Sequence, residues 1–220
     1  MKTIIVACKT LQEEIELANV RTGMNCEVKL IESGLHERPK KLSETVQELL
    51  NSLQADRVLL CLGQCGNAIV GIRTSDFEMI LPKVDDCLSL LIGSSKEKSR
   101  LSMKDKAFFL TMGWLSGENT VMSQYEHSKK KYGEETARSI LKMMYEHYET
   151  IGLIDTGTEP MNELYEQTEN IAGLLNLSIK IYPGTLSYIE QLLTGPWPKD
   201  RFIIKKPFET VSAEDFFGIS

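Results

Sequence analysis

Thiol side chains come just after three separate runs of the type that forms β-strands. Cys8, Cys65 and Cys87 each stand close behind such a run, and His36 follows another. If these strands are neighbours in a parallel sheet, their carboxyl ends share one edge, and the thiols and the imidazole converge there. Sulfur and nitrogen donors of this kind suit zinc or an iron–sulfur cluster. We therefore expect a metal site formed by Cys8, His36, Cys65 and Cys87; the alternative is that Cys8 and Cys87 are small buried apolar residues.

The segment RVLLCLGQCGNAIVG holds the sharpest local pattern, an apolar strand that runs into a glycine-flanked turn. Gly63 and Gly66 would allow a tight turn that presents Cys65 at the N-terminus of a helix, where the helix dipole favours a thiolate. The layout is similar to the nucleophile elbow of hydrolases, with Asn67 in place of the last glycine. A second hypothesis is therefore an enzyme with Cys65 as nucleophile and His36 as base. Alternatively, Gly63 and Gly66 serve only to form the turn, and Cys65 has no catalytic role.

Other residues at predicted strand tips are candidates for a ligand cleft. Trp114 can stack on a flat ligand, although a packing role is more common for tryptophan. Asp155 and Thr156 belong to an IDTG segment. Aspartic proteases pair two aspartates across a two-fold axis, so a single copy in an alternating strand and helix pattern excludes that class. The candidate cofactor-binding residues are Gly63, Gly66, Asn67, Trp114, Asp155 and Thr156.

Short β-branched runs alternate with amphipathic stretches, which predicts an α/β fold with a largely parallel sheet and helices on both faces. An amphipathic helix is expected at 41–54, and a longer one at 120–148 with a break near Gly133. The predicted strands are 3–7, 27–32, 57–62, 77–81, 106–112, 152–155, 178–182 and 201–205.

The polar segment 94–105 separates four predicted strands from the other four. We expect two Rossmann-like lobes with a cleft between them, an N-terminal lobe at 1–100 that carries the Cys/His site and a C-terminal lobe at 101–220. One continuous domain is the alternative.

Composition narrows the class of protein. The formal net charge of -6 disfavours nucleic-acid binding. The N-terminus lacks the pattern of a signal peptide, and no apolar run approaches the roughly 20 residues of a membrane span. We therefore expect a soluble cytoplasmic protein with reduced thiols and no membrane partner. The glycine motifs of P-loops and dinucleotide folds are missing, so no nucleotide cofactor is predicted. The oligomeric state is left open.

Several segments occur in an order that resembles the family known as domain of unknown function 1638. They are AC at 7–8, HERPKKL at 36–42, GQCGNAIVG at 63–71, LPKVDDCLSLLIGS at 81–94, FLTMGWL at 109–115, YGEETA at 132–137 and YETIGLIDTG at 148–157. The resemblance places Cys8, His36, Cys65 and Cys87 on polar motifs of the family. Family members commonly have arginine and histidine where this chain has Lys83 and Asp85. The resemblance therefore assigns no role to Lys83 or Asp85.

The resemblance implies a cytoplasmic protein of anaerobic microbes, often encoded beside corrinoid-dependent methyltransferases and their corrinoid proteins. A corrinoid is then a further candidate cofactor, and a corrinoid protein or a methyltransferase a candidate partner. The first functional hypothesis is a metal-binding protein that assists corrinoid or methyl-group metabolism. Besides the Cys65 enzyme, the remaining alternative is a binding module whose cleft recognises its partner without chemistry.

Overall fold

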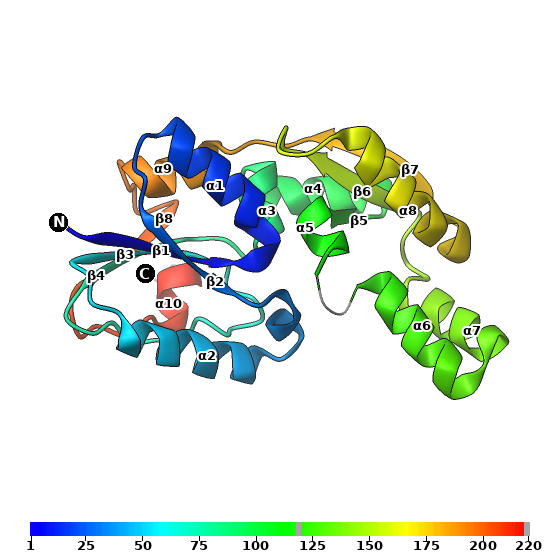
Figure 1. The fold of residues 1–220 in the computed structure, drawn as a ribbon, viewed down its shortest axis with the longest axis horizontal. Coiled ribbons are helices and arrows are strands. Elements are labelled where there is room, and N and C mark those ends of the chain that lie inside the picture. Colours follow the sequence, from blue (N-terminus) through cyan, green and yellow to red (C-terminus); the bar gives the residue numbers. More distant parts are fainter. Residues whose placement is uncertain (118–119, 218–220) are drawn as a thin grey trace.

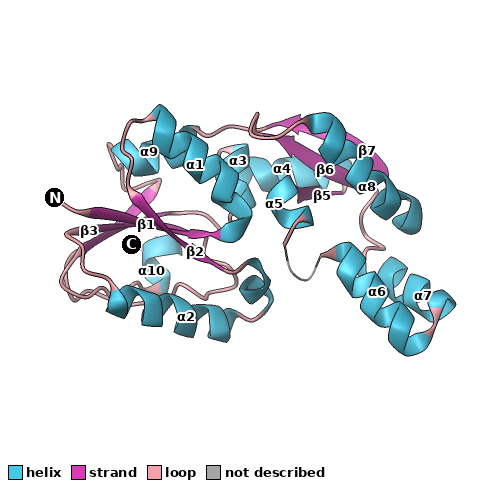
Figure 2. Ribbon diagram, in the orientation of Figure 1, coloured by secondary structure: helices cyan, strands magenta, loops and turns pink. Residues whose placement is uncertain are grey.

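The computed structural model describes residues 1–117 and 120–217, which form a mixed α/β structure (Figure 1, Figure 2). Within these residues the strands form two sheets. The first has the order β2-β1-β3-β4-β8, in which β8 alone runs antiparallel to its neighbour, and the second is the parallel sheet β5-β6-β7. The predicted α/β class with largely parallel sheets is confirmed.

Every predicted strand is present in the described residues, with its ends displaced by two residues or fewer. After a polar or charged first residue, the central strands of the first sheet are apolar and buried, because helices cover both faces. The strands are β1 (Thr3–Cys8), β2 (Glu27–Ile31), β3 (Arg57–Cys61), β4 (Glu78–Pro82), β5 (Ala107–Leu110), β6 (Thr150–Asp155), β7 (Ser178–Pro183) and β8 (Phe202–Lys205).

Helices α1 (Gln12–Arg21) and α9 (Ser187–Thr194) pack together over one face of the first sheet, and α2 (Pro39–Ser52) and α10 (Ala213–Phe217) lie over the other (Figure 1). The helix predicted at 41–54 begins earlier, because proline fits the first turn of a helix. Its apolar face is buried through Leu42, Val46 and Leu50.

Around the second sheet lie α4 (Ser95–Asp105), α5 (Met112–Leu115) and α8 (Met161–Leu175). The long helix predicted at 120–148 is broken as expected, because Gly133 has a φ of 84° that ends one helix and starts the next. The two resulting helices, α6 (Val121–Tyr132) and α7 (Glu134–Met144), form a hairpin that extends away from the sheet (Figure 1). No helix in the described ranges combines the length and apolar character that a bilayer span needs.

The division into lobes at residue 100 stays a prediction. Buried apolar residues form two clusters, but the larger one, centred on the first sheet, also includes Ala107, Phe109, Ile154 and Tyr182 of the second sheet. The chain also returns to the first sheet at its end, because β8 pairs with β4. Residues 118–119 and 218–220 of the expected second lobe lie outside the described residues.

Tight backbone packing joins the tip of β1 to the segment after β5. A Cβ atom added at Gly113 would lie 2.2 Å from the carbonyl oxygen of Thr10, and one at Gly117 would lie 2.8 Å from Ser33 Oγ. Thr10 belongs to the 3-10 helix η1 (Lys9–Leu11). Glycine is therefore required at 113 if the two segments are to touch.

The substitution Gly113→Ala should lower the free energy of unfolding by about 1–3 kcal/mol, since backbone must shift to admit the methyl group. Gly173→Ala is the matched control, because that glycine lies in α8 with nothing within 4 Å of the added Cβ. It should raise the free energy of unfolding by about 0.5–1 kcal/mol. Urea denaturation measures both, and equal effects would contradict the proposed contact.

A buried carboxyl group also bridges the two sheets. Glu14 in α1 is 4% exposed, and its Oε1 accepts a hydrogen bond of 3.0 Å from Thr156, just beyond β6. Burial raises the pKa of Glu14, and the hydrogen bond from Thr156 offsets only part of that effect.

Because the folded state holds the proton of Glu14 more tightly than the unfolded state, stability should fall as pH rises above the unfolded pKa of about 4.3. Glu14→Gln keeps the acceptor and removes the charge. We expect its Tm to exceed that of the parent at about pH 8 and to approach it at about pH 4, where Glu14 is mostly protonated in both the folded and the unfolded state. A Tm below the parent's at the higher pH would contradict this account.

Candidate functional site

The order of the first sheet brings the predicted site together. The chain runs from β1 to β2 on one side and then to β3 and β4 on the other, so the order of strands reverses between β1 and β3. Ligands of open parallel sheets bind beyond the carboxyl ends of strands at such a point. Cys8 is the last residue of β1, and Cys65 and Cys87 follow β3 and β4.

The loops after β3 and β4 stay hydrogen-bonded to each other beyond the strands. Gln64 N donates to Val84 O and Cys65 N donates to Asp85 O, both at 2.9 Å. A Cβ at Gly63 would lie 2.5 Å from the backbone of Asp86, so only glycine permits this approach. The paired loops therefore carry Cys65 alongside the segment that holds Cys87.

The four predicted ligands line one cavity of about 320 Å³, which we call the thiol cavity. Cys8 and Cys87 are buried, while Cys65 and His36 are partly exposed. Trp114, also predicted as a cleft residue, closes one side. The thiol cavity is lined by Cys8, Glu32, His36, Leu42, Leu62, Cys65, Gly66, Asp85, Asp86, Cys87 and Trp114.

The thiol of Cys87 lies close enough to interact with those of both Cys8 and Cys65. Interaction with Cys87 and burial raise the pKa of Cys8, and interaction with Cys65 and burial raise the pKa of Cys87. A donor also reaches one of the sulfurs, since Thr10 Oγ1 donates to Cys8 Sγ at 3.1 Å. This donor stabilises sulfur that carries negative charge.

His36 lies in the 3-10 helix η2 (Ser33–Glu37), where its Nδ1 hydrogen-bonds to the carbonyl oxygen of Ser33. Because a carbonyl oxygen only accepts, Nδ1 is the protonated nitrogen and Nε2 carries the lone pair. The ring packs against Trp114 with a centroid separation of 4.6 Å. This orientation suits both a metal ligand and a base.

The helix predicted directly after Cys65 is wrong. Residues 65–71 form turns, and Cys65, Gly66 and Asn67 have successive φ angles of 47°, 64° and 70°. The left-handed region ends any right-handed helix, so the segment cannot supply a helix dipole to the thiol. Gly66 lines the thiol cavity, whereas Asn67 faces a separate groove beside α2.

An acidic cluster borders the thiol cavity. Lys98 from α4 pairs with Asp85 at 2.7 Å and also with Asp86. Burial of Asp85 opposes its charge, but hydrogen bonds from Lys98, Ser89 and Ser95 outweigh burial and lower the pKa of Asp85 to about 2. Asp86 Oδ1 also accepts from Ser89 N at 3.0 Å at the start of α3 (Leu88–Ile92), as expected for a helix cap.

Two predicted residues lie elsewhere. Asp155 accepts a hydrogen bond of 3.0 Å from Gly157 N within its own turn, and Thr156 is bonded to Glu14. Neither lines the thiol cavity. The other two cysteines also lie outside the thiol cavity, since Cys61 is fully buried in β3 and Cys26 stands before β2.

Among the described residues, no group of three or more His, Cys, Asp or Glu side chains is arranged, as placed, to hold a metal ion. The thiols converge, but a metal would require side chains to turn toward a common centre. A rotation about χ1 is enough to move a cysteine sulfur from one staggered position to another.

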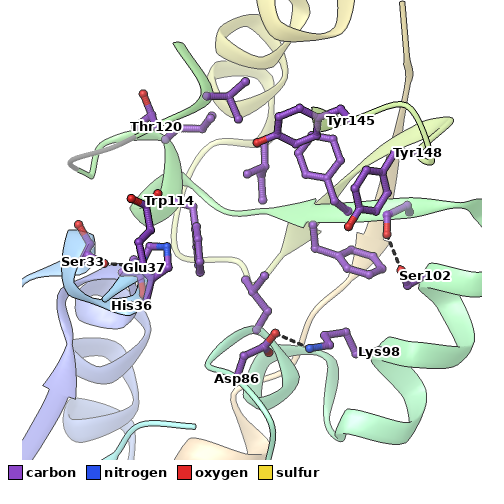
Figure 3. Close-up of a pocket in the computed structure, with 18 of the residues that line it drawn as sticks. Ser33, His36, Glu37, Asp86, Lys98, Ser102, Trp114, Thr120, Tyr145 and Tyr148 are labelled. Atoms are coloured by element: carbon purple, nitrogen blue, oxygen red, sulfur yellow. Dashed lines mark hydrogen bonds and ion pairs between the residues drawn. The ribbon is translucent and has the colours of Figure 1, made fainter. Parts of the chain in front are cut away.

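A second cavity, of about 410 Å³, adjoins the first, and His36, Asp86 and Trp114 line both. Its other walls bring together side chains from β5, α6 and the segment that follows α7 (Figure 3). Sequence reasoning missed Phe108, Tyr145 and Tyr148, which line it. The close spacing of Tyr145 and Tyr148 in the sequence was the one feature that could have indicated an aromatic site there.

Comparison with known proteins gives one match. No curated protein and no solved structure matches the chain. A family model described as a protein of unknown function, DUF1638, matches residues 30–193, which include His36, Cys65, Cys87 and the paired loops. Since this match covers well over half of the 220 residues, the chain belongs to the DUF1638 family.

Proposed function

We propose that the chain is a metal-binding protein whose thiol cavity takes zinc or an iron–sulfur cluster. Cys8, Cys65 and Cys87 would be ligands, and His36 would offer Nε2 as a further one. The observation that carries the proposal is the convergence of three interacting thiols in a single cavity.

The donor set fits such a metal. Thiolate and imidazole are the ligands that zinc prefers, and iron–sulfur clusters are held by thiolates. The hydrogen bond from Thr10 would stabilise the thiolate of Cys8, and the hydrogen bond to Ser33 orients the imidazole. No described cation lines the thiol cavity, so a bound metal would supply the positive charge that three thiolates need.

The family resemblance supports a role in corrinoid or methyl-group metabolism. A corrinoid protein or a corrinoid-dependent methyltransferase is the partner we propose on that basis. The metal would then have one of two roles. It would take part in the chemistry of a thiolate or a methyl group, or it would stabilise this chain so that the chain can bind its partner.

Metal analysis of protein purified without oxygen tests the site. We expect about one zinc ion or one cluster per chain, and its loss in Cys65→Ser and Cys87→Ser. Cys26→Ser is the matched control, because Cys26 is a free thiol outside the thiol cavity, and it should keep the full metal content. Metal-free parent protein, or equal metal content in all variants, would refute the proposal.

A second candidate function is favoured by the geometry of Cys65. This residue combines a partly exposed thiol with a φ of 47°, and backbone in sparsely populated regions concentrates at functional sites. Cys65 would act as a nucleophile, with His36 Nε2 taking its proton.

The nucleophile hypothesis predicts that iodoacetamide modifies Cys65 of metal-free protein at about pH 7 at least about tenfold faster than free cysteine. His36→Ala should remove that excess, because it deletes the base. His127→Ala is the control, since His127 is exposed on α6. Mass spectrometry of peptides locates the modification, and a rate equal to that of free cysteine would exclude this function.

A further inference from the structure

The second cavity has two aromatic walls, and we call it the aromatic cavity. On one side Phe108 packs against Tyr145 and Tyr148, with ring centroids 4.9 Å and 5.2 Å apart. On the other side Trp114 stands beside His36 (Figure 3). At about 410 Å³ the space lies in the range of small-molecule sites. Its walls therefore present π systems to whatever occupies it.

The charges around the aromatic cavity favour a positive ligand. The charged side chains among its described lining residues are Glu37, Asp86 and Lys98. Lys98 is already paired with both Asp85 and Asp86, so that cluster is negative as a whole. Glu37 adds a second negative charge, and the hydrogen bond of 3.0 Å that it accepts from the neutral amide of Gln124 leaves that charge uncompensated. Among the described lining residues, no unpaired lysine or arginine is available to bind an anion.

The negative charge of Glu37 reaches the aromatic wall. Burial raises the pKa of Tyr145, and the neighbouring Tyr148 and Glu37 raise it further. A cation in this cavity would meet the electron-rich ring faces and the carboxylate together. Aromatic cages with a nearby carboxylate are how proteins hold quaternary ammonium groups.

We propose that the aromatic cavity binds a small methylated ammonium ion between Trp114 and the wall of Phe108, Tyr145 and Tyr148, with Glu37 as its counter-charge. The ligand also carries a hydrogen-bond acceptor. Trp114 Nε1 is buried without a partner among the described residues, and a buried donor of this kind favours a ligand that accepts its hydrogen bond. The proposal does not depend on a metal in the thiol cavity.

Calorimetric titration of the full chain tests the ligand class with choline and its uncharged carbon isostere, dimethylbutanol. The two probes have nearly the same shape and differ in charge. Choline should bind about tenfold more tightly, because a cation–π contact is worth about 1–2 kcal/mol in a desolvated site. No binding of choline, or equal affinity for both probes, would overturn the proposal.

Two variants locate the binding. Glu37→Gln should weaken choline several-fold and leave dimethylbutanol unchanged, whereas Glu126→Gln, on the exposed surface of α6, should change neither. Trp114→Leu should weaken choline about tenfold. If both Glu37→Gln and Trp114→Leu bind choline like the parent, the cation lies elsewhere and the proposal fails. The same titration with Cys65→Ser separates this site from the metal site. That variant should bind choline like the parent, because the proposal does not depend on a metal in the thiol cavity.

Discussion

The backbone contact between the loops that follow β3 and β4 determines the geometry of the site. Gly63 lies so close to Asp86 that no side chain fits between them, and two hydrogen bonds continue the pairing beyond the strands. This contact brings Cys65 to Cys87, and the pairing of β1 with β3 adds Cys8. The three thiols are far apart in sequence, so their proximity depends on the sheet and on this one approach.

A similar constraint joins the two halves of the molecule. Gly113 packs on the backbone of Thr10, and Thr10 donates to the sulfur of Cys8. Trp114, next in the chain, then lies between the thiol cavity and the aromatic cavity and lines both. The segment after β5 thus belongs to the site as much as the tips of the first sheet do, and a change at Gly113 would disturb both cavities.

The strands could be predicted from local patterns, whereas the convergence of the cysteines could be expected only if their strands were neighbours, because the sequence does not give the strand order. Prediction failed after Cys65, where hydrogen bonds to the loop after β4 hold three residues at positive φ instead of a helix. The aromatic cavity was missed for a related reason. Phe108, Trp114 and Tyr148 come from separate elements, and no periodicity in the chain relates them. The return of β8 to β4 depends likewise on contacts across the whole chain.

The central claim is that Cys8, Cys65 and Cys87 bind one soft metal together. X-ray absorption at the zinc edge of the zinc-loaded chain tests it most directly, because the method identifies the atoms bound to the metal. The account predicts about three sulfur ligands at about 2.3 Å with the remaining position filled by nitrogen or oxygen. A shell of nitrogen and oxygen alone would contradict it, because the zinc would then be bound away from the thiols.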